Sequence, residues 1–272
     1  RSTLFPYTTL FRSSIIRCSN IGLYDEALNI LDSIRIGSGL DKTVLGTYYE
    51  AYNNVYGELS YYTRLDDMRQ HYQQKEQYYK QLMFENLPAT SESCFLRREQ
   101  AAQAEGKLKE AMAINDEWMK TVEPGSHPYA LVALYRYIEY KLQGDSTQMM
   151  YWLTESVLAD IRNAAMDQGS MWELANELML SGDVDRASRY ISYTSDCANR
   201  YGSRQRNWQI APLLTHIANE YKSQSERITS HLWGTVAVIS ILALLLLGAL
   251  FFVHRRNTQL HAARNDLKTS ND

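Results

Sequence analysis

The longest apolar stretch of the chain runs from Leu232 to Val253, where 22 consecutive residues carry no charge. A helix of that length spans about 33 Å, which is close to the thickness of a bilayer hydrocarbon core. Trp233 stands at one end of the run, as aromatic residues commonly do at a membrane interface. The pattern therefore predicts one transmembrane helix at residues 232–253.

Basic residues follow this run more densely than they precede it. Arg255 and Arg256 come almost directly after it, whereas the 20 residues before it hold only Lys222 and Arg227. Positively charged flanks of a transmembrane helix stay in the cytoplasm. We therefore expect a single-pass protein of a bacterial inner membrane, with its N-terminal part periplasmic and its C-terminus cytoplasmic.

A short phrase recurs in the rest of the chain, consisting of a glycine followed five residues later by a small residue. The copies are Gly22–Leu28, Gly106–Ala111, Gly182–Ala187 and a weaker one at Gly144–Met149. The glycines at 106, 144 and 182 are 38 residues apart in both steps, which is typical of a repeat. Glycine suits the left-handed turn that ends one helix, and a small residue lets the next helix pack closely.

Apolar residues at helical spacing predict paired helices around these glycines. The expected buried stripes are Ala27, Leu28, Leu31 and Ile34 after Gly22; Trp172, Leu174, Ala175, Leu178 and Met179 before Gly182; and Val184, Ala187, Ile191 and Thr194 after it. A further pair without a marking glycine is expected at residues 43–84. With 5 prolines and 13 glycines in 272 residues, the chain favours an all-α fold over a sheet protein.

The stretch at residues 43–84 is also rich in tyrosine, which offers a rigid apolar face and one polar group. Its tyrosines are Tyr48, Tyr49, Tyr52, Tyr56, Tyr61, Tyr62, Tyr72, Tyr78 and Tyr79. One hypothesis is a groove for a protein or peptide, with the first six as candidate binding residues. The alternative is that the tyrosines pack between helices, which is the commoner use of such spacing.

Composition and motifs give little support to catalysis. The chain is 45% apolar with a net charge of -3, so it can bury a core and has no bulk attraction to nucleic acid. The six histidines show no HExxH spacing, and no glycine-rich phosphate loop or nucleophile elbow occurs. We therefore expect no enzyme, no metal and no cofactor. The three cysteines, Cys18, Cys94 and Cys197, are expected as buried free thiols rather than a disulfide pair.

The two ends of the chain differ in character. Residues 6–13 read PYTTLFRS, which one frame of a widely used sequencing adapter encodes, so we expect residues 1–13 to be a cloning or assembly scar that replaces the native N-terminus and export signal. The repeat domain is then expected at residues 14–204 and a juxtamembrane helix at 205–231, kinked or restarted at Pro212. Residues 254–272 are expected to begin a cytoplasmic coiled coil through Leu260, Ala263 and Leu267, and the membrane-proximal helix could form a homodimer.

The glycine phrase with alanines at 27, 111 and 187 resembles tetratricopeptide repeats, although the usual repeat has about 34 residues. The order of helical repeats, one membrane helix and a basic flank resembles bacterial single-pass regulators with periplasmic tetratricopeptide repeats. The likeness is greatest from Asp183 to Arg256, including DCANRYGSRQRNWQIAPLLTHIANEY. This resemblance implies a sensor or transcriptional regulator whose output region would follow residue 272.

Two other roles compete with the sensor hypothesis. A passive scaffold would tether an envelope assembly through the repeat surface without sending a signal. The sensor half of a histidine kinase would place a phosphoacceptor after the membrane, but His261-Ala262-Ala263-Arg264 lacks the acidic residue and downstream proline of such a box.

Overall fold

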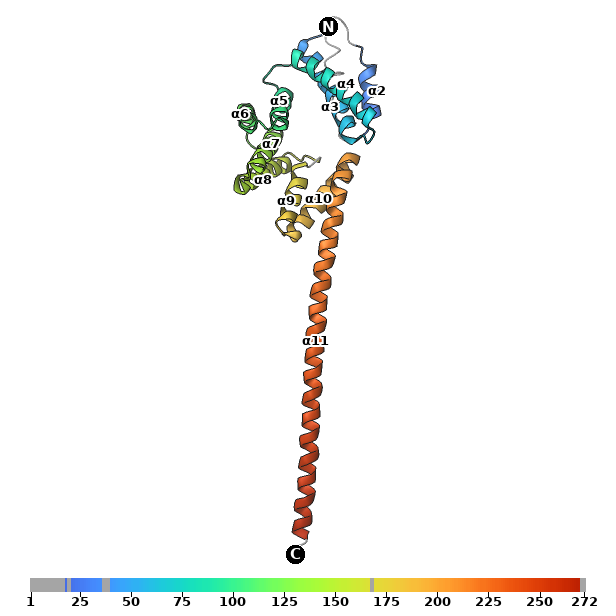
Figure 1. Ribbon diagram of the computed structural model, residues 1–272, viewed down its shortest axis with the longest axis vertical. Coiled ribbons are helices and arrows are strands. Elements are labelled where there is room, and N and C mark those ends of the chain that lie inside the picture. The colour runs from blue at the N-terminus through green and yellow to red at the C-terminus, as the bar shows by residue number, and fades with distance from the viewer. Residues whose placement is uncertain (1–17, 19–20, 36–39, 167–168, 270–272) are drawn as a thin grey trace. The chain divides into compact units, whose positions relative to one another are not determined.

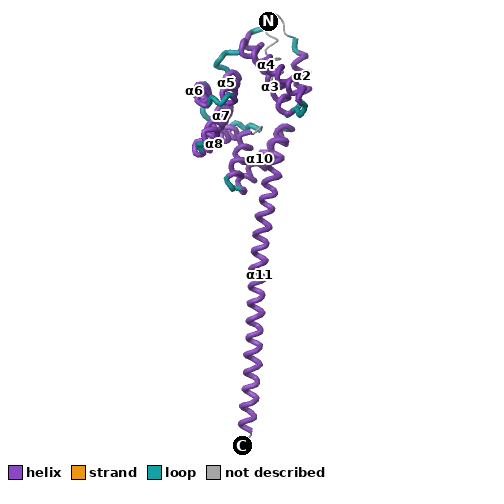
Figure 2. The backbone as a smooth tube through the Cα atoms, in the orientation of Figure 1, coloured by secondary structure: helices purple, strands orange, loops and turns teal. Residues whose placement is uncertain are grey.

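The computed structural model describes residues 18, 21–35, 40–166 and 169–269, and every regular element within these ranges is a helix (Figures 1 and 2). The helices are α2 (Tyr24–Ser33), α3 (Lys42–Tyr62), α4 (Asp66–Asn86), α5 (Glu92–Ala104), α6 (Leu108–Met119), α7 (His127–Gln143), α8 (Ser146–Arg162), α9 (Gly169–Leu180), α10 (Val184–Tyr201) and α11 (Arg204–Thr269). The all-α prediction is therefore confirmed. The chain divides into two compact units, one up to Ile217 and one from Ala218.

Helices that follow one another in the first unit pack as pairs, namely α3 with α4, α5 with α6, α7 with α8 and α9 with α10. Three of these pairs turn at the glycines of the recurring phrase. Gly106, Gly144 and Gly182 have φ angles of 71°, 79° and 86°, and Gly22, just before α2, has 81°. The expected left-handed turn is thus present at all four glycines, where a side chain would strain the backbone.

The residue after the glycine has two roles at the same turn. The backbone N–H of Asp145 donates to the Tyr140 carbonyl (3.1 Å), which ends α7, while its carboxylate accepts the N–H groups of Thr147 (3.1 Å) and Gln148 (3.0 Å), which begins α8. Asp183 does the same between α9 and α10, with Leu178 and Arg186 as partners. The Gly-Asp dipeptide therefore satisfies backbone groups that both helix ends would otherwise leave unpaired.

The small residue of the phrase lies in the core. Ala27, Ala111 and Ala187 are fully buried, each on the helix that follows its glycine. The whole expected stripe of α10 is buried (Val184, Ala187, Ile191 and Thr194), and on α9 Leu174, Ala175 and Leu178 are buried while Trp172 and Met179 pack against them. Periodicity thus identified the packing faces correctly.

The pair expected at residues 43–84 is α3 and α4, which meet at a turn from Thr63 to Leu65 without glycine. The three cysteines are free thiols, with Cys94 and Cys197 buried and Cys18 half-buried. The proposed scar at residues 1–13 lies outside the described residues.

Helix α11 continues without interruption through Pro212, so of the two expected alternatives, a kink or a restart, the restart does not occur. Ile210, Leu213 and Ile217 are buried, as expected for the apolar side of this segment. Trp208 and Tyr221, placed on the same side by the sequence analysis, are instead 68% and 51% exposed. An apolar side chain on this helix is therefore not always a core residue.

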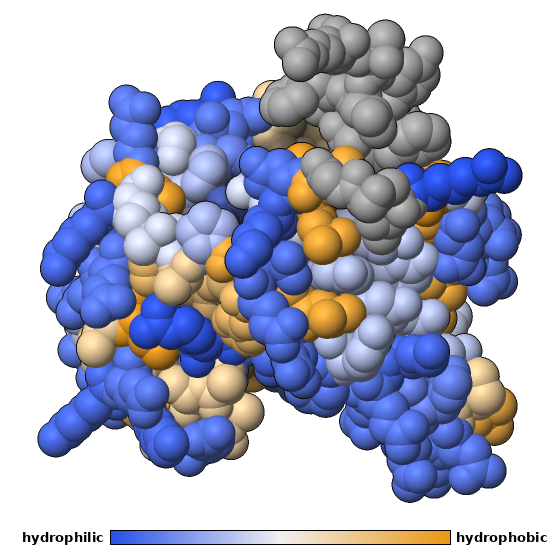
Figure 3. Space-filling model, turned by 90° about the horizontal axis from the view of Figure 1, so that it is seen from above, coloured by the Kyte–Doolittle hydropathy of each residue, from blue (hydrophilic) through white to orange (hydrophobic). Residues whose placement is uncertain are grey.

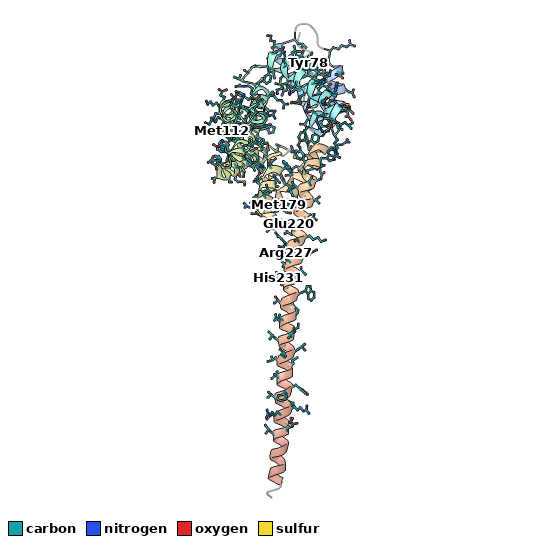
Figure 4. All side chains as sticks on the ribbon, in the orientation of Figure 1. Tyr78, Met112, Met179, Glu220, Arg227 and His231 are labelled. Carbon is teal, nitrogen blue, oxygen red and sulfur yellow. The ribbon has the colours of Figure 1, made fainter. Side chains whose placement is uncertain are left out.

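The second unit consists of the remainder of α11, which is long and apolar enough to cross a membrane. Its most apolar window is not covered by any other part of the described chain, unlike the core helix of a soluble protein, and in Figure 4 side chains project from it on several sides. The side chains of His261, Ala263 and Leu267 lie outside the described residues, as do residues 270–272. The coiled coil therefore stays a prediction, and the structure does not test the histidine-kinase alternative.

Candidate functional site

Four of the nine tyrosines form a stacked group between α3 and α4. The Tyr52 and Tyr79 rings lie 4.3 Å apart and nearly parallel, the Tyr56 and Tyr79 rings 5.7 Å apart, and Tyr48 meets Tyr52 edge to face at 5.1 Å. Tyr52 is only 4% exposed. Offset and edge-to-face contacts of this kind stabilise a packed interior. These rings therefore join helices in the structure.

Two tyrosine hydroxyl groups of this stack connect α3 to α2 by hydrogen bonds. Tyr52 donates to a carboxylate oxygen of Asp32, and Tyr48 donates to the Leu31 carbonyl at 3.3 Å. Burial, with the bonds to Asp32 and Tyr48 as smaller causes, raises the pKa of Tyr52, so its phenol stays neutral and can donate. Tyr52 is thus held by both its ring and its hydroxyl.

The remaining tyrosines are placed differently. Tyr49 is half-buried beside Tyr79, with ring centroids 6.2 Å apart, whereas Tyr61 and Tyr78 are 77% and 58% exposed. Tyr62 and Tyr72 face a cavity. The structure therefore does not bring the six candidate binding residues together on one surface.

The cavity, which we term the aromatic pocket, has a volume of about 440 Å³. Its lining comes from three parts of the first unit: the start of α2, the end of α3 with the first turns of α4, and the first turns of α11. The lining residues are Gly22, Tyr24, Leu59, Tyr62, Thr63, Tyr72, Arg204 and Trp208. Of the tyrosines proposed from sequence as binding residues, only Tyr62 belongs to it.

Contacts between distant segments build this pocket. The amide of Gln209 donates to the Tyr62 hydroxyl at 2.8 Å, and the indole of Trp208 meets the Tyr62 ring edge to face at 6.4 Å. The backbone N–H of Arg204 donates to the Ile21 carbonyl at 3.2 Å. The first two turns of α11 therefore contact the segment before α2 and the end of α3.

The polar groups around the pocket are suited to binding rather than to bond breaking. Burial raises the pKa of Tyr24, and Glu58 and Tyr62 raise it further, so this phenol stays a neutral donor. In the described part of the chain, no three His, Cys, Asp or Glu side chains come together as metal ligands would. A pocket lined by aromatic side chains and one arginine can hold an apolar or aromatic group together with an anion.

Sequence reasoning missed Tyr24, Arg204 and Trp208 as parts of the pocket. Trp208 carried the one usable signal, since tryptophan is enriched among the residues that contribute most to binding. The visible face in Figure 3 is mostly hydrophilic, with apolar residues in small groups.

Helical hairpins joined by a left-handed glycine, with a buried alanine on the following helix, define a tetratricopeptide-like repeat protein. The chain belongs to the family of the SusR N-terminal TPR domain, whose family model matches residues 12–212. This range includes every lining residue of the aromatic pocket and ends before the apolar run at 232–253. No curated protein matches the chain.

Proposed function

We propose that this chain is a membrane-anchored sensor that binds a protein or peptide in the aromatic pocket and passes the binding event along α11. The observation that supports this proposal is the composition of the pocket. Arg204 and Trp208 belong to α11, the same helix that carries the apolar run, while the opposite wall belongs to α2, α3 and α4.

A bound group that touches both walls would stabilise their contact. The wall residues Tyr62 and Trp208 already meet, but Trp208 remains 68% exposed, so much of its ring is free to contact a partner. A ligand shifts an equilibrium only through different affinities for the two states. An occupant held by Tyr72 and Trp208 together would favour the state in which α11 is docked on the first helices.

The positive charge of Arg204 indicates that a bound partner should carry an acidic group. Arg204, an exposed residue, lines a largely apolar pocket, and no ion pair joins its side chain to an acidic residue of the described chain. Guanidinium groups bind carboxylates in a geometrically specific way. We therefore propose an apolar or aromatic peptide residue followed closely by a carboxylate, such as the C-terminus of a chain.

Truncating Trp208 tests the pocket. Peptides with free C-termini, selected on the wild-type chain from a random library, should bind Trp208→Ala about tenfold or more weakly, because an aromatic anchor at a binding site contributes at least about 1.4 kcal/mol. Calorimetric titration measures the loss. The matched control is Tyr78→Ala, an exposed tyrosine away from the pocket lining, which should bind as the wild type does.

Two outcomes separate the parts of this proposal. Amidating the peptide C-terminus should weaken binding to the wild type but not to Arg204→Gln. Equal affinity of the selected peptides for Trp208→Ala and wild type would show that the pocket is not the binding site. A third result would favour the passive scaffold. In that case Trp208→Ala loses peptide binding, but a reporter fused after residue 272 of the wild-type chain does not respond when a peptide binds.

The membrane orientation requires its own experiment. With an export signal restored at the N-terminus, a reporter active only in the cytoplasm should be active when fused after Asp272, because Arg255 and Arg256 retain the C-terminal flank there. A reporter active only in the periplasm should be silent at the same position. The reverse pattern would place the repeats in the cytoplasm and contradict the proposed topology.

A further inference from the structure

A pair of acidic side chains lies in the core of the repeat domain, away from the aromatic pocket. Glu99 of α5 and Glu139 of α7 have no exposed surface, and we term them the buried carboxyl pair. The two carboxyl groups lie next to each other. Acidic residues are almost never fully buried unless they are paired with a cation or a donor.

The donors available to this pair are few. The Asn115 amide donates to Glu99 Oε1 at 3.0 Å and to the Val132 carbonyl at 3.1 Å. Glu99 Oε2 and both oxygens of Glu139 are buried without any hydrogen-bond partner. Three of the four carboxyl oxygens are therefore unsatisfied as long as both groups are ionised.

Arg136 is the cation near the buried carboxyl pair, and it also interacts with Asn115 and Asp116. Arg136 Nε lies 3.6 Å from Glu139 Oε2, which is too far for a hydrogen bond, and donates instead to Asn115 Oδ1 at 2.8 Å. Its Nη2 is paired with the exposed Asp116 of α6. One guanidinium thus faces three carboxylates.

Among the described residues, no cation other than Arg136 acts on the buried carboxyl pair. Helix α8 contributes the neutral Trp152, whose ring centroid lies 5.7 Å from Arg136 Cζ. On α5, Arg97 donates to Gln100 and Asn54. Burial raises the pKa of Tyr135, which keeps this α7 phenol neutral at physiological pH.

We infer that the α5–α6–α7 core binds a proton in its folded state, shared between Glu99 and Glu139, and that this core loses stability when alkaline pH removes the proton. The geometry carries the inference. Two adjacent buried carboxylates repel each other and can only accept hydrogen bonds, whereas one added proton lets one group donate to the other. Leaving both charged would bury an uncompensated anion, which costs several kcal/mol.

The pKa values of Glu99 and Glu139 define the pH range over which this stability is lost. Burial raises the pKa of Glu99 to about 7, and burial together with the neighbouring Glu99 carboxylate raises the pKa of Glu139 to about 9. Because both folded-state values lie above the ordinary value of 4.5, the folded chain binds more protons than the unfolded chain. The resulting stability is fully present below about pH 4.5 and is lost as the pH rises towards about 9.

The amide variant Glu139→Gln, which mimics the protonated group, tests this inference. In detergent micelles, the full chain and Glu139→Gln should melt at similar temperatures at about pH 5, whereas at about pH 9 the variant should melt several degrees higher. Circular dichroism follows the transition. Glu117→Gln is the matched control, because Glu117 is an exposed carboxylate on α6 and should leave the pH dependence of the wild type unchanged.

Infrared spectroscopy supplies a readout that does not depend on the stability of a variant. At neutral pH the exposed carboxylates are ionised, so a C=O band of a neutral carboxylic acid in the wild type reports a buried carboxyl group. Burial also raises the pKa of Glu173, so a variant that lacks both members of the buried carboxyl pair is needed to assign the band. We expect this band at neutral pH, its loss as the pH rises past about 9, and its reduction or loss in the double variant Glu99→Gln/Glu139→Gln, which has neither carboxyl group of the pair. A wild type without the band near neutral pH, or equal pH dependence of melting in wild type and Glu139→Gln, would overturn the inference.

Discussion

Replacing Tyr52 with serine should lower the free energy of unfolding by about 2–5 kcal/mol, the range for removing a large buried side chain. The ring is almost fully buried against Tyr79, and its hydroxyl reaches Asp32 of α2. The substitution leaves a cavity between α3 and α4 and removes the bond to α2 at the same time. Chemical denaturation followed by circular dichroism measures the loss.

Tyr78 is the control for this change because it lies next to Tyr79 in sequence but is 58% exposed. Serine and tyrosine have similar helix propensities, so Tyr78→Ser should cost about 0.5 kcal/mol or less. An equally small effect of Tyr52→Ser would mean that the tyrosine stack contributes little to the fold, and would return these residues to consideration as a binding surface.

Ala187→Trp should destabilise the repeat domain by about 1–3 kcal/mol or more through overpacking. Ala187 is fully buried on α10, in the cluster that also holds Leu178, Ile191 and Ile210. An indole can enter this space only if α10 moves away from α9. Thermal unfolding should show a lower and broader transition.

Asp185→Ala, two residues earlier on the exposed side of α10, is the matched comparison. It removes an acidic residue from the first turn of the helix and should cost less than about 0.5 kcal/mol. Similar melting shifts for Ala187→Trp and Asp185→Ala would contradict the close packing of these two helices.

Local patterns in the sequence were sufficient to predict the helical pairs. Gly182 and Ala187 are five residues apart, and both the turn and the packed face follow from short-range geometry. The same reasoning failed at Trp208, because periodicity assigns a side chain to an apolar face but does not show whether another helix covers that face. Whether Pro212 interrupts a helix also depends on its tertiary surroundings.

The aromatic pocket could not be predicted, since it depends on contacts between distant residues. Tyr62 and Gln209 are 147 positions apart, and no spacing rule connects them. The buried carboxyl pair could not be predicted from the sequence either, for a different reason. A glutamate in a helix is most often a solvated charge, and only the packing of α5 against α6 and α7 shows that Glu99 and Glu139 meet inside the domain.

The double role of Asp145 and Asp183 bears on how such repeats can change over time. Because each residue completes one helix and starts the next, the turn has no spare position in which an extra residue could be accommodated. An insertion there would uncouple two helix ends at once, whereas substitutions on the outer faces of the helices leave both ends intact. Divergence in this architecture should therefore gather on helix surfaces and in the connections between hairpins, while the length of the turn within a hairpin stays fixed.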